Sequence, residues 1–236
     1  MKKKVLILTT FDTFFIKDLL VDLIKNCEKT VEFKFFIVAD YTNLMNIIIK
    51  LLSFGLLKSL YLGILNLYNK LNNKCISDIF NQNVIKNKNI NEIKNEIKDI
   101  DLILSINYPK LIPKKILKLA KFGGVNHHLG KLPKYAGRYP VAKAIIAKDK
   151  KICITLHHLS KSFDSGKIIS ETYVNISDFK NNFYLIYKKI FKMSLKPLTK
   201  VLKNKNKAMF IEKNTKIQKL KLIDFFKLYL LSNFKF

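Results

Sequence analysis

The sequence predicts an α/β fold, in which a mainly parallel, doubly wound, Rossmann-like sheet forms a single domain with a short C-terminal extension. Two observations support this fold class: short apolar runs typical of buried parallel strands, and segments of helical spacing that alternate with them. The expected strands are residues 4–10, 31–39 and 100–106, and the expected helices are residues 15–26 and 91–98. We place the domain at residues 1–205 and a basic, apolar extension at residues 206–236, because 236 residues are too few for two full domains.

The chain is strongly basic, with a formal net charge of +27. A charge of this size indicates an anionic partner, such as a small phosphorylated molecule, nucleic acid or a membrane surface. All but one of the 44 basic residues are lysine, the exception being Arg138. Proteins that read nucleic acids favour arginine, whose planar fork pairs with phosphates and bases. The composition therefore argues against nucleic acid and favours small anionic ligands.

The three cysteines, Cys27, Cys75 and Cys153, are widely spaced and contain no C-x-x-C pair. This spacing supports neither a disulfide framework nor a zinc ribbon, and it indicates a reducing compartment. The first residues resemble a signal peptide only superficially, since the apolar run is short and Asp12 follows it. We therefore expect a cytoplasmic protein.

Residues 44–68 are apolar almost without interruption, but Lys50 and Lys58 lie within the stretch. A lysine in the centre of a bilayer is costly, which argues against a membrane span. We expect a helix pair packed on the sheet, or an interfacial helix. The stretch also leaves peripheral membrane contact or a homodimer open as alternatives, as does the basic, aromatic segment at residues 216–236.

Residues with special backbone geometry are concentrated in one window. Four of the five prolines lie within residues 109–140, and four of the seven glycines within residues 123–137. No acidic residue occurs between Asp101 and Asp149, where nine lysines and Arg138 do. Loops of fixed shape beside a rigid sheet are common places for functional sites, and the positive charge suits an anionic ligand.

The four histidines form two adjacent pairs, at residues 127–128 and 157–158. Neighbouring residues of an extended chain point to opposite sides, so we expect one histidine of each pair to face a site. Asn126, His128 and Asp164 could together provide a general base, an oxyanion donor and an orienting carboxylate. Two alternatives are structural histidines and a zinc site, but the zinc-protease motif H-E-x-x-H is absent. We expect no metal.

Two runs, GGVNHHLGKLPKYAGRYPVAKAI at residues 123–145 and TLHHLSKSFDSGKII at residues 155–169, resemble the catalytic domain of formyltransferases. The shared pattern is Asn-x-His, then Leu-Pro-x-Tyr-x-Gly, then Asp-x-Gly after a strand. The resemblance covers roughly residues 1–200 and is specific because several spaced elements match. The chain departs from the family in two places: Leu129 and Gly130 replace a frequent Pro-Ser, and TTFDTFF replaces the phosphate loop of the glycinamide ribonucleotide enzymes.

The resemblance implies transfer of a formyl group from 10-formyltetrahydrofolate, a co-substrate, to an amine, with Asn126, His128 and Asp164 as the catalytic residues. It also implies two sets of binding residues. The set expected to bind the folate is Leu104, Ile106, Tyr108, Pro109, Leu159 and Phe163. The set expected to bind the acceptor is Thr10, Lys134, Tyr135 and Arg138.

The acceptor follows by elimination. The missing phosphate loop argues against glycinamide ribonucleotide, and about thirty residues after the domain are too few for the second domain of the methionyl-tRNA enzymes. We therefore expect a nucleotide-linked amino sugar, a small anionic acceptor. A catalytically idle, basic protein that associates with membranes or nucleic acid on the same scaffold is the alternative from another class.

Overall fold

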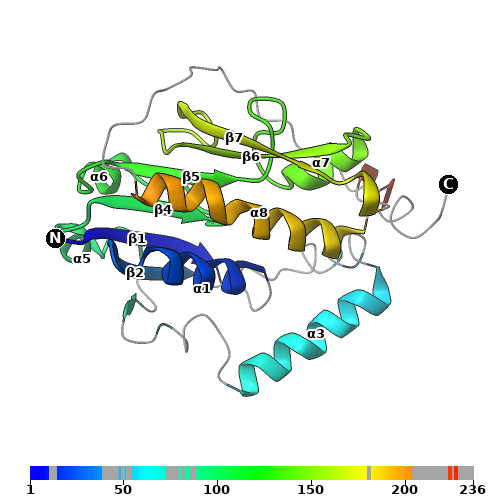
Figure 1. Ribbon diagram of the computed structural model, residues 1–236, viewed down its shortest axis with the longest axis horizontal. Helices are drawn as coiled ribbons and strands as arrows, with labels where there is room; N and C mark the ends of the chain where they lie inside the picture. The colour runs from blue at the N-terminus through cyan, green and yellow to red at the C-terminus, as the bar shows by residue number, and fades with distance from the viewer. Residues whose placement is uncertain are drawn as a thin grey trace.

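The computed structural model describes residues 1–10, 15–38, 48, 51, 55–72, 80, 83–85, 89–179, 182–203, 223–224 and 226–227. It shows one sheet with helices on both faces (Figure 1). The predicted α/β fold with a mainly parallel, doubly wound sheet is confirmed.

The sheet has seven strands in the order β3-β2-β1-β4-β5-β6-β7. The first five strands of the sheet run parallel, and β6 and β7 pair antiparallel. The strands are β1 (Lys3–Thr10), β2 (Val31–Val38), β3 (Val84–Ile85), β4 (Leu102–Ile106), β5 (Gly124–His128), β6 (Lys151–His158) and β7 (Ile168–Asn175). Because the parallel strands share one direction, their carboxyl ends meet at one edge, where sites in this class of fold are built.

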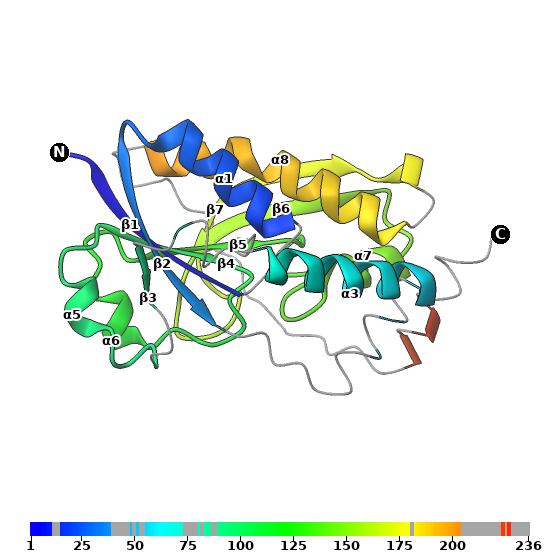
Figure 2. The ribbon, with the colours of Figure 1, turned by 90° about the horizontal axis from the view of Figure 1, so that it is seen from below.

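Helices cover the sheet on both faces. The helices α1 (Phe15–Cys27) and α8 (Phe183–Lys203) lie side by side on one face (Figure 2). The short helices α5 (Lys94–Ile97) and α6 (Lys114–Leu117) lie on the other face, while α7 (Pro140–Ile146) packs beside β6. A 3-10 turn, η2 (Ser177–Phe179), precedes α8.

The covering helices explain why the central strands are apolar on both faces. In β1, Val5 and Ile7 pack into the core under α1 and α8, while Leu6 and Leu8 pack into the core under α5 and α6. All four side chains are fully buried. A strand that is buried on both faces has a continuous run of apolar residues in its sequence, and this pattern predicted the strand.

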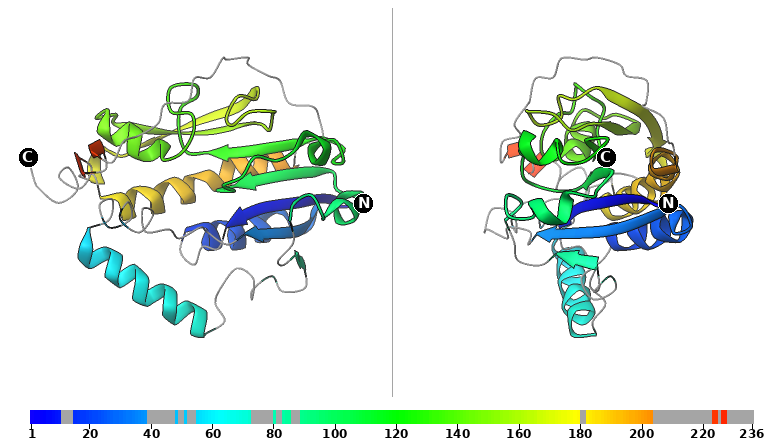
Figure 3. Two further views of the ribbon diagram at one scale, coloured as in Figure 1. Left: turned by 180° about the vertical axis from the view of Figure 1, so that it is seen from behind. Right: turned by 90° about the vertical axis from the view of Figure 1, so that its left-hand side faces the viewer.

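The predicted helix at residues 91–98 is shorter than expected, since α5 spans Lys94–Ile97. The apolar stretch at residues 44–68 is only partly described. Most of its described part belongs to α3 (Leu56–Leu71), which stands away from the sheet, beyond its β2–β3 edge (Figure 3). The prediction that this stretch packs on the sheet is therefore wrong for α3. Its helical periodicity was compatible with burial, but it does not say which surface accepts the helix.

Within the described ranges, no helix is both long enough and apolar enough to cross a membrane. Most of the predicted extension at residues 206–236 lies outside the described residues, as does residue 39 at the end of the predicted second strand.

Candidate active site

Strand β5 sends its side chains alternately to the two faces of the sheet. Asn126 and His128 lie on the face that also carries α5 and α6. His127 lies on the opposite face, where its Nε2 is 2.7 Å from Oγ of Ser194 in α8. The Ser194 hydroxyl donates to the carbonyl of Ile190, so His127 Nε2 carries the proton and donates to Ser194. One histidine of this pair therefore faces the candidate site, and the other is part of the helix-covered core.

The antiparallel pairing of β5 with β6 adds a second histidine to the same face. Asn126 pairs with His157, and His128 pairs with Thr155. His157 is almost fully buried, and its Nε2 is 3.0 Å from Nδ2 of Asn126. The carbonyl of His158 accepts from His157 Nδ1 at 2.9 Å, so the Nε2 atom is the proton acceptor. The sequence singles out this histidine pair, but the predicted catalytic set did not include His157.

Asp164 reaches the same point from the loop between β6 and β7. Its backbone is left-handed, with φ of 53°, and its side chain is 9% exposed. One oxygen, Oδ2, accepts from the backbone N–H of Gly137 at 2.7 Å. The loop can turn here because Gly166 lies against the backbone of His158, where a Cβ atom would overlap the carbonyl oxygen.

The other oxygen of Asp164, Oδ1, lies between the three remaining polar groups. Asn126 Nδ2 donates to it at 3.2 Å, while His128 Nδ1 is 3.5 Å away and His157 Nε2 is 3.4 Å away. Both amide hydrogens of Asn126 are therefore engaged, one by Asp164 and the other by His157. The arrangement fixes Asp164 beside two imidazoles.

The proton positions on His128 follow from its second nitrogen. His128 Nε2 donates to the carbonyl of Tyr135 at 2.9 Å, which leaves Nδ1 as the free base facing Asp164. Gly130 permits this approach, since a Cβ there would lie 3.1 Å from His128 Nε2 and 2.6 Å from Cβ of Pro140. A proton taken up on Nδ1 would lie directly against the carboxylate.

Burial controls the protonation of this group of residues. Desolvation lowers the pKa of His128, against the opposing effects of Asp164 and of the Tyr135 carbonyl. Burial by itself raises the pKa of Asp164, but contact with His157, the charge that His128 carries when it is protonated and the Gly137 N–H outweigh it and hold the pKa below its ordinary value. At neutral pH the site therefore holds a neutral His128 beside an ionised Asp164, which is the pairing that a general base and its orienting carboxylate require.

The residues expected to bind folate divide into two groups. Leu104 and Ile106 are fully buried, and their side chains face α1 and α8, on the side of the sheet opposite Asn126. Tyr108 and Leu159 pack into the core on the Asn126 side of the sheet. Pro109 and Phe163 are exposed, Phe163 at 46%, directly before Asp164. Ser105, which pairs with Asn126 on that face, was not among the predicted residues.

The residues expected to bind the acceptor lie at the carboxyl edge of the sheet. Thr10 is buried at the end of β1, and its hydroxyl accepts from Asn107 Nδ2 at 3.0 Å. Tyr135 joins the site to its surroundings, because its carbonyl holds His128 and its hydroxyl donates to Asp149 at 2.6 Å. Lys134 is exposed and pairs with Asp149, whereas the guanidinium of Arg138 stacks on the Tyr139 ring at 5.2 Å.

A cavity of about 390 Å³ lies beside Tyr135 rather than at Asp164. Cys153 and Lys151 line it from β6, on the side of that strand that also carries Thr155 and His157. Its walls carry four lysines, one acid and two aromatic rings, and the full lining is Lys131, Lys134, Tyr135, Asp149, Lys150, Lys151, Cys153 and Tyr173. The cavity is thus a basic, aromatic pocket, and it adjoins the candidate site through Tyr135, whose carbonyl accepts from His128.

Among the described residues, no group of three histidine, cysteine, aspartate or glutamate side chains could hold a metal ion.

The fold and this cluster define a Rossmann-like domain with an Asn–His–Asp centre at the carboxyl edge of its sheet. The sequence model of the formyl transferase family matches residues 72–202, more than half of the chain. The chain therefore belongs to the formyl transferase family.

Relatives and solved structures agree with this family. A methionyl-tRNA formyltransferase of Staphylococcus aureus is 37% identical over 83 residues, which are 35% of this chain and 27% of the relative. The GDP-perosamine N-formyltransferase of Brucella melitensis is 35% identical over 98 residues, 42% of this chain and 38% of the relative. A 4-N formyltransferase structure from Francisella tularensis shares the fold, with a TM-score of 0.62 at 22% identity, over 94% of this chain and 77% of that one. The matched segments span well under half the length of the two relatives.

Proposed function

We propose that this protein transfers a formyl group from 10-formyltetrahydrofolate to the amino group of a nucleotide-linked amino sugar. The observation that carries the proposal is that Asn126 and His128, from one strand, both lie against one carboxylate oxygen of Asp164, which comes from a distant loop. Bound 10-formyltetrahydrofolate would supply the formyl carbon. The buried Tyr108, the half-buried Leu159 and the exposed Phe163 ring fit an aromatic ligand on the Asn126 face of the sheet.

His128 has the geometry of the general base for the attacking amine. Its Nδ1 takes the proton that the amine loses, and the carboxylate of Asp164 stabilises the imidazolium so formed. The imidazolium would then return this proton to the tetrahydrofolate nitrogen as the bond from that nitrogen to the formyl carbon breaks. Asn126 holds Asp164 and His157 in place through its two amide hydrogens. Once protonated, His128 is also the donor available to negative charge developing on the formyl oxygen.

The basic pocket beside Tyr135 supports an anionic acceptor. Its four lysines suit a diphosphate, and the rings of Tyr135 and Tyr173 suit a nucleotide base. Phosphate binding there would place the far end of an amino sugar toward His128, on the same side of β6.

The acceptor can be identified by incubating the whole chain with 10-formyltetrahydrofolate and a panel of amines. The panel contains UDP-, GDP- and dTDP-linked amino sugars, glycinamide ribonucleotide and initiator methionyl-tRNA, and mass spectrometry detects the formylated product. We expect formylation of an amino-sugar nucleotide. Formylation of the ribonucleotide or the tRNA alone would disprove the acceptor, and no product from any member would count against transferase activity.

Variants test the assigned centre. Asp164→Asn, His128→Ala and Asn126→Ala should each lower turnover by about a hundredfold or more, the usual effect of losing an acid–base group or its orienting partner. Asp178→Asn makes the same chemical change at an exposed carboxylate outside this cluster and should leave turnover unchanged. Wild-type turnover in Asp164→Asn would show that the reaction uses another centre.

A further inference from the structure

Helix α3 (Leu56–Leu71) exposes a band of large apolar side chains. Elsewhere in the described part of the chain, most apolar side chains lie in cores on both faces of the sheet, and the exposed ones do not form a continuous helix face of this kind. The members of this band and their exposures are Leu57 81%, Leu60 61%, Tyr61 60%, Ile64 61%, Leu67 58%, Tyr68 51% and Leu71 75%.

The band occupies one side of the helix because its residues recur every three or four positions. The opposite side carries three polar residues, Ser59, Asn66 and Asn69, together with the half-buried Leu62, and Asn69 is buried at 7% exposure. A helix on the surface of a globular protein normally faces the other way, with its apolar side inward. The orientation of α3 therefore calls for something that covers its outer side.

Charge distinguishes between two partners that could cover the band, a second copy of the chain and a lipid bilayer. The sequence from residue 41 to residue 77 contains four lysines and no acidic residue, and the whole chain carries +27. A second copy brings the same charge to the contact and is repelled. A bilayer with anionic headgroups attracts this segment, and each lysine near such a surface adds to the attraction.

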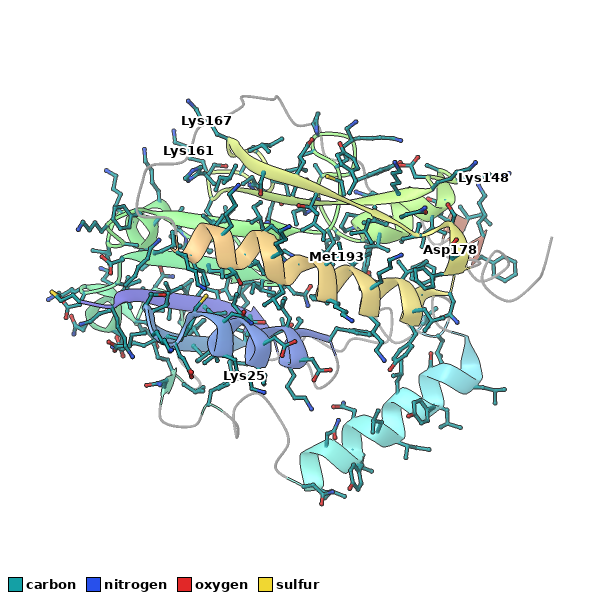
Figure 4. All side chains as sticks on the ribbon, in the orientation of Figure 1. Lys25, Lys148, Lys161, Lys167, Asp178 and Met193 are labelled. Atoms are coloured by element: carbon teal, nitrogen blue, oxygen red, sulfur yellow. The ribbon has the colours of Figure 1, made fainter. Side chains whose placement is uncertain are left out.

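The length of α3 determines how it meets a bilayer. Sixteen residues make a helix of about 24 Å, shorter than the roughly 30 Å of a hydrocarbon core. A helix of this kind lies in the plane of the interface with its apolar side down. Helix α3 stands apart from the other described helices and strands along most of its length (Figure 4). Tyr61 and Tyr68 suit the interface, where a ring with a polar tip is favoured.

We propose that α3 docks the protein on an anionic lipid surface, with the exposed apolar band of α3 inserted at the level of the headgroups. Docking leaves the Asn126–His128–Asp164 centre outside the contact, because α3 lies beyond the opposite edge of the sheet from β6 (Figure 3). The activity proposed above does not depend on it.

Flotation of the whole chain with vesicles tests the proposal. Vesicles of phosphatidylcholine mixed with phosphatidylglycerol should carry the protein, and vesicles of phosphatidylcholine alone should carry far less. A triple variant, Leu60→Ser, Ile64→Ser and Leu67→Ser, should reduce the partition coefficient at least about tenfold, since three apolar side chains that insert into the bilayer are lost. The matched control changes three exposed apolar residues elsewhere, Leu111→Ser, Leu185→Ser and Met193→Ser, and should bind as the wild type does.

A second measurement covers the case in which the triple variant is misfolded. The chain has no tryptophan, so Ile64→Trp introduces a single reporter in the band. Its emission should shift to the blue when mixed vesicles are added and be quenched by lipids brominated on their chains, whereas Leu185→Trp on α8 should show neither effect. Equal vesicle binding by the triple variant and the wild type, or an unshifted Ile64→Trp, would overturn the proposal. So would a salt-resistant dimer that the triple variant abolishes while vesicles bind neither protein.

Discussion

His127 and His128 are neighbours in the sequence with opposite surroundings. His128 shares the Asn126 face with Asp164, while His127 is enclosed under α8 against Ser194. Burial lowers the pKa of His127 to about 3, and the charge of His128 adds to that shift. The two residues therefore contribute to different properties of the molecule, His128 to the candidate chemistry and His127 to stability.

The buried His127 predicts a loss of stability in mild acid. The unfolded chain binds a proton at this histidine below its ordinary pKa of 6.5, while the folded chain does not bind one until about pH 3. Between these values the unfolded state holds more protons, so the free energy of unfolding decreases as the pH falls. The contribution lost over the whole window is roughly 4–5 kcal/mol. Urea denaturation at a series of pH values measures it.

His127→Leu is the variant that isolates this effect. It replaces the imidazole with an apolar side chain of similar bulk and so removes the titrating group. The free energy of unfolding of this variant should therefore fall less steeply than that of the wild type as the pH is lowered from about 6.5 to 4.5. The same experiment on His158→Leu, a half-buried histidine, is the comparison. Parallel pH curves for His127→Leu and the wild type would mean that His127 titrates normally in the folded chain.

The polar members of the site could be predicted from the sequence only where the chain itself fixes their relation. Alternation along a strand places Asn126 and His128 on one side and His127 on the other, whatever the rest of the fold. His157 joins them only through the antiparallel register of β5 and β6, which places it beside Asn126. The periodicity of a single strand does not determine its register with another strand when a loop and a helix separate the two. His157 therefore could not be assigned to the site from the sequence. The same limit applies to Leu104 and Ile106, whose side of the sheet depends on β4 pairing with β5.

At the scale of elements, the loop from β6 to β7 positions Asp164. Gly166 lies so close to β6 that a methyl group there would overlap the His158 carbonyl oxygen. Gly166→Ala must displace either the loop or the strand, because the new Cβ atom would overlap backbone atoms of His158 rather than a flexible side chain. We expect a loss of about 1–3 kcal/mol in the free energy of unfolding, and a loss of turnover as Asp164 moves.

Gly63→Ala in α3 is the matched control, since nothing lies within 4 Å of a Cβ at that position. Alanine is the better helix former, so this change should raise stability by up to about 1 kcal/mol. Thermal unfolding of the two variants should thus shift in opposite directions. A Gly166→Ala protein as stable and active as the wild type would show that the loop does not hold Asp164 in place.

The elements themselves differ in how far the sequence predicts them. The runs at residues 4–10 and 100–106 were recognisable as strands because both their faces are buried. The two-residue β3 carries too little pattern to be recognised, and the antiparallel direction of β6 depends on the connection through α7 rather than on its own residues. The position of α3 also could not be predicted, because an apolar periodicity indicates that one side of a helix is covered but not which surface covers it.

At the scale of the whole molecule, the excess of positive charge makes stability depend on salt. Four lysines follow one another at intervals of four residues along the exposed side of α8: Lys188, Lys192, Lys196 and Lys200. Like charges at this spacing repel one another on a helix. Such repulsion extends over the molecule, since the chain carries 44 basic and 17 acidic residues.

Salt should therefore stabilise this protein. Screening at about 1 M salt shortens the range of the repulsion to about 3 Å, so the free energy of unfolding should rise with sodium chloride instead of falling. Lys192→Glu should raise stability at low salt, because it replaces two repulsive spacings with attractive pairs to Lys188 and Lys196, worth about 0.2–0.5 kcal/mol each. Lys192→Gln, which only removes a charge, should give a smaller gain, and both gains should disappear at high salt. Urea denaturation at low and high sodium chloride measures all three proteins, and a wild-type stability that falls with salt would show that attractive ion pairs outweigh the repulsion.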